Sequence, residues 1–133
     1  MSTPTKKQVA NRELWVEALR SGEYKQGEGL LQEGPPGATR FCVWGVACDV
    51  IDPHQWSRFG PYVQHSRALS YPPQSVEDAM GMLMYENLWT DGRCVANPSL
   101  VVLNDSKEFS FDELADLIQL HTLDQLDQLD GGV

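Results

Sequence analysis

Two of the three cysteines, Cys42 and Cys48, lie in the most apolar stretch of the chain, RFCVWGVACDVID at residues 40–52. Along an α-helix their separation gives a rise of about 9 Å and a rotation of about 240°, so the two thiols would point in different directions, too far apart for a disulfide. The C-x-x-C and H-x-x-x-H pairs that are typical of zinc sites do not occur. An odd number of cysteines in a cytosolic chain favours free thiols, and we predict no metal site.

A nucleophilic role stays open for Cys42, because a cysteine in the first turn of a helix has a lowered thiol pKa. Its general base would be one of three histidines, and Asn104 or Asp105 would orient that base. The three histidines are His54, His65 and His121. The alternative is that a free cysteine among Val, Trp and Phe packs as a small hydrophobic residue. We favour packing, and we predict no catalytic residue, no cofactor and a chain that is more consistent with a non-enzymatic protein.

A second constellation lies between Asp52 and Glu77, where the 24 residues PHQWSRFGPYVQHSRALSYPPQSV contain no acid, although the whole chain has a net charge of −9. Arginine binds phosphates and carboxylates through paired hydrogen bonds, and nucleobases stack on aromatic rings. We therefore predict that this segment, with one asparagine from the turn before the last helix, binds a small anionic ligand. The predicted ligand-binding residues are Trp56, Arg58, Phe59, Tyr62, His65, Arg67, Tyr71 and Asn104.

The negative charge gathers near the C-terminus, where eight acids stand against Lys107 alone between Asp105 and Val133. This balance argues against binding nucleic acid through its backbone, which requires Lys and Arg. An acidic surface gives solubility, or it binds a basic partner protein. No apolar run approaches the ~20 residues of a membrane span, and the N-terminus lacks the apolar core of a signal peptide. We expect a cytosolic protein without a membrane partner.

These residues need helices and strands to position them, and 133 residues, 41% of them apolar, suit one compact domain. As a helix, the stretch at 40–52 is apolar on nearly all sides, which predicts a buried central helix that ends before Pro53. Ser110 and Glu113 predict a capping box at the start of the last helix. Asn11 is expected to cap a first helix that runs to about Ser21.

The other segments are less regular. We expect a short strand near residues 25–32 with a return strand after the turn EGPPGAT, and a long loop where prolines occur at 53, 61, 72 and 73. Ser75 is expected to open a helix to about Glu86, and WTDGRC to form the turn of a small hairpin. PSLVVLND is compatible with a helix or a strand. The repeat LDQLDQLDGGV is a frayed helical extension, a solvated tail or a partner-binding segment.

The predicted fold class is therefore α+β: a compact, mostly helical single domain with a small β-hairpin and a long loop rich in proline and aromatic residues. We place a flexible N-terminus at residues 1–10, the globular domain at 11–122 and an acidic C-terminal tail at 123–133.

Four segments of this chain resemble a family of small proteins encoded by phages and prophages: LWVEALRSGEYKQGEGLL, RFCVWGVACDV, YPPQSVEDAMGM and LVVLNDSKEFSFDELADLI. That family has a second cysteine beside the first, where this chain has Val43, which weakens a catalytic role for the cysteines. The resemblance implies that SLVVLN is a short helix before a turn at residues 104–106. It also implies an accessory protein that acts in the host cytoplasm, against the host or its defences, which is an argument by analogy.

Three functions follow as expectations. The first is a sponge that binds and sequesters a small anionic ligand such as a signalling nucleotide. The alternative is an acidic inhibitor that occupies a host protein, and the second alternative is a small Cys/His enzyme. A homo-oligomer is compatible with the first function, because small binding proteins often build their pockets between subunits.

Overall fold

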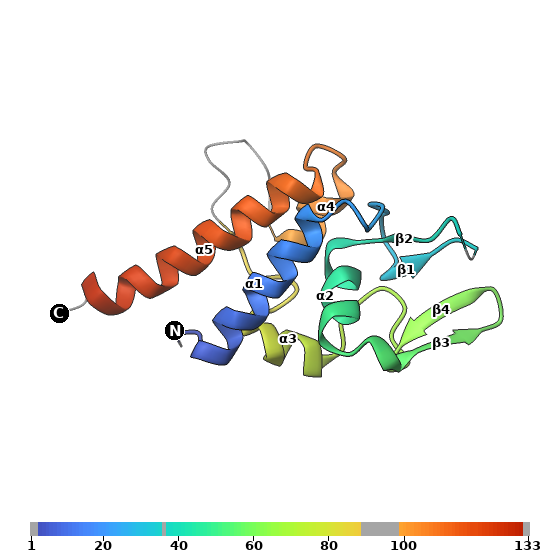
Figure 1. The fold of residues 1–133 in the computed structure, drawn as a ribbon, viewed down its shortest axis with the longest axis horizontal. Coiled ribbons are helices and arrows are strands. Elements are labelled where there is room, and N and C mark those ends of the chain that lie inside the picture. Colours follow the sequence, from blue (N-terminus) through green and yellow to red (C-terminus); the bar gives the residue numbers. More distant parts are fainter. Residues whose placement is uncertain (1–2, 36, 89–98, 132–133) are drawn as a thin grey trace.

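The structure is a computed structural model that describes residues 3–35, 37–88 and 99–131. Its helices are α1 (Lys6–Arg20), α2 (Val43–Ile51), α3 (Gln74–Met80), α4 (Leu100–Asp105) and α5 (Phe111–Gly131), with a 3-10 turn η1 (Pro53–Gln55). Its strands form two antiparallel pairs, β1 (Gln32–Glu33) with β2 (Arg40–Phe41) and β3 (Trp56–Phe59) with β4 (Tyr62–His65). In Figure 1, α1 and α5 lie side by side, α2 crosses the middle, and both strand pairs lie on the far side of α2. The predicted α+β, mostly helical class is confirmed.

Helix α2 lies at the centre of the core, as its sequence predicts. Six consecutive residues, 43–48, are buried, so the helix contacts other elements on nearly every side. Trp44 stacks at a tilt on Trp15 of α1, with ring centroids 4.8 Å apart, and the Trp15 indole N–H donates to the Val43 oxygen at 3.0 Å. These contacts fix α1 against the N-terminal half of α2.

Helix α5 begins where the capping box predicts. The backbone N–H of Glu113 donates to Ser110 Oγ at 3.2 Å, and the backbone N–H of Ser110 donates to Glu113 Oε1 at 3.2 Å. The helix then continues through the LDQ repeat to Gly131. This agrees with the predicted helical extension, and partner binding by the repeat stays a prediction.

Helix α1 begins at Lys6, and its N-cap is Thr5 rather than Asn11. Thr5 and Gln8 form a reciprocal capping box, a Thr-x-x-Gln pattern that the sequence contains. Asn11 lies inside the helix, where its side-chain amide donates to the Ala79 oxygen at 2.8 Å. The expected start of this helix was wrong because Asn11 bonds a neighbouring helix instead of its own backbone.

Two further helices complete the domain. Helix α3 starts after Pro73 and ends at Met80, because Gly81 adopts a left-handed φ of +67° and its N–H closes on the Glu77 and Asp78 oxygens. The expected start at Ser75 and end near Glu86 were therefore wrong. The PSLVVLND segment forms helix α4, capped by Ser99, which resolves the choice between helix and strand. The predicted hairpin turn WTDGRC and Cys94 lie outside the described residues.

The two strand pairs lie partly at residues other than those predicted from the sequence. The first strand is β1, at the end of the predicted 25–32 range, and β2 is its return strand. The acid-free segment, expected as one long loop, folds at its centre into the β3–β4 hairpin, whose two-residue turn contains Gly60 at a φ of +61°. Glycine supplies this left-handed conformation without strain, and Pro61 after it still allows a tight turn.

Candidate functional site

The β3–β4 hairpin is tied to the central helix by one carboxylate. Asp49 of α2 accepts a hydrogen bond from the Trp56 indole N–H at 3.0 Å, and it accepts another from the Tyr24 hydroxyl. Phe41 packs edge-on against Trp56, with ring centroids 5.9 Å apart. Trp56 is therefore held in one orientation by its polar edge and by its neighbours.

His65, the last residue of β4, anchors the same hairpin to the core. Its side chain is fully buried, and its Nε2–H donates to the backbone oxygen of Asp52 at 2.8 Å. Its ring meets Trp56 edge-on at 4.9 Å, and its backbone pairs with Ala68. Because the ring and the backbone are both engaged within the fold, His65 acts as a structural support in this arrangement.

An open hollow lies beside the hairpin, between η1, the start of β3 and the end of β4. Its volume is about 430 Å³, and its lining residues are His54, Gln55, Trp56, Ser57, Ser66 and Arg67. None of these is an acid. Ser66 and Arg67 both adopt left-handed φ values, +50° and +72°, which are uncommon outside glycine. The Ser66 N–H bonds back to the Gln55 oxygen at 3.1 Å, which holds this turn against η1.

The cationic and donor groups of the hollow are available to a ligand. Arg67 and His54 are exposed, and neither has an ion pair or a side-chain hydrogen bond within the described parts of the chain. The Ser57 hydroxyl has only a long contact of 3.4 Å from Gln64 Nε2. A guanidinium, an imidazole and two hydroxyls around a hollow without acids can bind phosphate or carboxylate oxygens.

Only two of the eight predicted ligand-binding residues, Trp56 and Arg67, line this hollow. Arg58 is exposed on β3, opposite Val63, and Tyr62 is exposed opposite the backbone of Phe59. Tyr71 is 60% exposed and does not line the hollow. The hollow adds His54, Gln55, Ser57 and Ser66, which the sequence reasoning did not include. All four lie in the same acid-free segment, which was the available signal.

Asn104 lies elsewhere, buried between α4 and α2. Its Oδ1 accepts from the Val43 N–H at 3.2 Å and from Gln26 Nε2 at 3.1 Å, and its Nδ2 donates to the Gly27 oxygen at 2.9 Å. The side chain thus joins α4 to the N-terminus of α2 and to the segment before β1. It does not line the hollow beside the hairpin.

The chemistry of the cysteines does not favour a nucleophile. Cys42 is the N-cap of α2, where its Sγ accepts from the Gly45 N–H at 3.3 Å. Burial raises the pKa of Cys42 to about 11, and this effect outweighs the backbone N–H groups of Gly45 and Trp44, which lower the pKa; the negative charge of Asp105 adds a smaller increase. Burial also raises the pKa of Cys48. Both thiols are free and buried, as predicted, and no group of three potential metal ligands occurs among the described residues.

We expect both buried thiols to resist alkylation in the native protein, because the thiolate is the reactive form and a pKa of about 11 keeps Cys42 protonated at mildly alkaline pH. The test is mass spectrometry of a Cys94→Ser variant after iodoacetamide treatment. Two adducts should form in guanidinium and none without it. Rapid native labelling of Cys42 would contradict this account and restore the nucleophile hypothesis.

In the described part of the chain, no helix combines the length and the apolar character that crossing a bilayer requires. A protein-family model described as a domain of unknown function, DUF8296, matches residues 6–122, from the start of α1 to the middle of α5. The comparison with curated proteins and the comparison with solved structures each give no match.

Proposed function

We propose that this chain, which belongs to the domain family of unknown function DUF8296, binds a small anionic ligand in the hollow beside the β3–β4 hairpin. The observation that carries the proposal is the unpaired Arg67 beside His54 in a hollow whose described lining contains no acid, although the chain has a net charge of −9. In an acidic protein, an arginine without an ion-pair partner attracts phosphate or carboxylate groups specifically.

Each lining residue would contact a different part of the ligand. Arg67 presents a planar guanidinium that can donate two parallel hydrogen bonds to one phosphate. The Ser57 hydroxyl can donate to a remaining oxygen, and the Ser66 hydroxyl can do so in exchange for its long contact of 3.4 Å with His65 Nδ1. The indole N–H of Trp56 is engaged by Asp49, so Trp56 offers its ring for stacking rather than a donor. This set suits a nucleotide, in which an anionic group and an aromatic base occur together.

The biological role is part of the proposal. The resemblance to small phage and prophage proteins supports an accessory protein, directed against a host defence, that sequesters a signalling nucleotide in the host cytoplasm. Sequestration requires binding without chemistry, which agrees with two protonated, buried cysteines.

We expect Arg67→Ala to weaken ligand binding roughly ten- to a hundredfold, because a hydrogen bond to a charged group contributes about 1.5–3 kcal/mol. Isothermal calorimetry against cyclic dinucleotides, ADP-ribose and inorganic pyrophosphate measures the effect. The matched control is Arg40→Ala, which removes an equally charged, exposed arginine from β2, outside the hollow. Arg40→Ala should bind as the wild type does.

A second variant separates binding from folding. Arg67 has a φ of +72°, so Arg67→Gly should relieve backbone strain while it removes the guanidinium. This variant should be at least as stable as the wild type and should still bind weakly. Equal losses in Arg67→Ala and Arg40→Ala would mean that net charge alone attracts the ligand, and unchanged binding in both would place the site elsewhere.

A further inference from the structure

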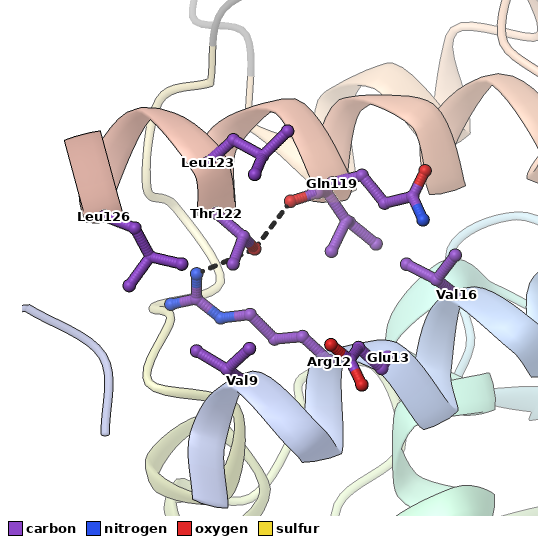
Figure 2. Close-up of a pocket in the computed structure, with 9 residues that line it drawn as sticks. Val9, Arg12, Glu13, Val16, Gln119, Thr122, Leu123 and Leu126 are labelled. Atoms are coloured by element: carbon purple, nitrogen blue, oxygen red, sulfur yellow. Dashed lines mark hydrogen bonds between the residues drawn. The ribbon is translucent and has the colours of Figure 1, made fainter. Parts of the chain in front are cut away.

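A groove with apolar walls runs between α1 and α5, on the opposite side of α2 from the hairpins. Its volume is about 300 Å³, and its apolar walls are Val9 and Val16 from α1 with Ile118, Leu123 and Leu126 from α5. Figure 2 shows Leu123 and Leu126 along one wall and Val9 and Val16 along the other. The groove is distinct from the hollow proposed for the anionic ligand, with which it shares no lining residue.

The guanidinium of Arg12, at the floor of the groove, already has its hydrogen-bond acceptors within the fold. Arg12 crosses from α1 to α5, as Figure 2 shows, and is 1% exposed. Its guanidinium donates to Thr122 Oγ1 at 3.0 Å, to Gln125 Oε1 at 2.6 Å and to the Gly81 oxygen at 2.9 Å. The surface that remains for a partner is therefore mainly aliphatic. Leu123 is 57% exposed there, so covering it would remove apolar area from water.

The charges on the two helices that form the groove are mostly negative. Helix α5 carries six acids and no Lys or Arg, and α1 adds the exposed Glu13 and Glu17. Arg12 is buried and Arg20 is engaged by Asp116, which leaves Lys6 and Lys7 in the first turn as the other exposed bases of α1. The C-terminal end of α5 adds the negative pole of the helix dipole, with no basic residue in its last turn.

We propose that this groove binds an amphipathic helix with basic flanks from a partner protein. A groove between two antiparallel helices accepts a third helix through apolar residues at i, i+3, i+4 and i+7. Lysines and arginines flanking that apolar stripe would meet the acids of α5, so the charges are complementary. A second copy of this chain would bring another net charge of −9 against the same acids, and like charges across an interface oppose association.

The probe is a fluorescein-labelled peptide of about 18 residues, ~27 Å of helix, with leucines on one face and lysines on the other. Two comparison peptides carry glutamate in place of lysine, or prolines that break the helix. Fluorescence anisotropy at physiological ionic strength should show saturable binding of the basic helix and much weaker binding of the other two. Equal binding of the proline-broken peptide would overturn the proposal, because it would reflect unspecific charge attraction.

Two matched leucines locate the site. Leu123→Ser removes a wall of the groove, whereas Leu14→Ser removes a leucine of similar exposure, 52%, that lies outside the groove. Leu123→Ser should weaken peptide binding roughly tenfold or more, and Leu14→Ser should leave it unchanged. Equal effects in both variants would overturn the proposal. Sedimentation that shows a wild-type dimer and a monomeric Leu123→Ser variant would also overturn it, because the occupant would then be a second copy.

Discussion

Gly45→Ala should abolish the folded state, although alanine normally favours a helix over glycine by about 1 kcal/mol. A Cβ at this position would lie 1.7 Å from the Leu31 backbone oxygen and 2.7 Å from its carbonyl carbon. Leu31 cannot move away easily, because it is fully buried and its N–H donates to the Leu69 oxygen at 2.8 Å. The overlap involves backbone atoms, so no side-chain rotation relieves it.

The expected cost exceeds ~4–5 kcal/mol, which approaches the whole stability of a small domain, about 5–15 kcal/mol. Thermal unfolding followed by circular dichroism measures it. Val50→Ala is the control, since it places alanine in the same helix at a half-buried position, and it should cost only about 1 kcal/mol. An unfolding temperature of Gly45→Ala equal to or above that of the wild type would contradict the close packing of α2 on Leu31.

Arg12→Met should destabilise the protein by about 3–5 kcal/mol, because it leaves several buried acceptors without a donor and each unsatisfied group costs about 1–3 kcal/mol. Methionine keeps much of the aliphatic stem but removes every donor. The Met80 and Gly81 oxygens, at 2.7 Å and 2.9 Å from the guanidinium, would lose their partner in the interior. The same change removes the links to Thr122 and Gln125, so α1, the end of α3 and α5 would lose their common contact.

The control for Arg12 lies on the same helix. Arg20 also reaches α5, through Asp116 and Gln119, but its side chain is 38% exposed. Because exposed ion pairs contribute little, Arg20→Met should change the free energy of unfolding by less than ~1 kcal/mol. Urea denaturation of the two variants should therefore give clearly different midpoints. Equal midpoints would mean that the buried network around Arg12 does not hold the two helices together.

Local signals in the sequence predicted the elements whose structure depends on nearby residues. The stretch from Val43 to Ile51 is apolar on nearly all sides when it is drawn as a helix, which predicted that it would be a buried central helix. Ser110 and Glu113 lie three residues apart, so their capping box is visible without a structure. The α+β class followed from these helices together with the short strands beside glycine and proline.

Contacts between distant residues were not predictable in the same way. Asn11 is a plausible helix cap in sequence, but its amide bonds Ala79, which is 68 residues away. Likewise, Asn104 was predicted to contact a ligand, yet its amide joins Gln26, Gly27 and Val43. A buried amide and a ligand-binding amide are identical in sequence, and only the tertiary fold distinguishes them.

The candidate site was predictable at the level of a segment. The absence of acids between Asp52 and Glu77 identified the region that contains the hollow. Which side chains share the hollow depends on the hairpin register, which places Trp56 opposite His65 and Arg58 opposite Val63. The left-handed turn at Ser66 and Arg67 then brings Arg67 beside His54. A turn of this kind at two non-glycine residues has no simple sequence signature.

The central claim, an anionic ligand in the hollow beside the hairpin, is tested most directly by nuclear magnetic resonance of the ¹⁵N-labelled protein. ADP-ribose and inorganic pyrophosphate would be titrated while backbone amide shifts and the Trp56 indole signal are followed. The account predicts saturable shifts centred on residues 54–57 and 66–67, and their loss in Arg67→Ala. Shifts centred on other residues, or no saturable shift with either probe or with cyclic dinucleotides, would contradict it.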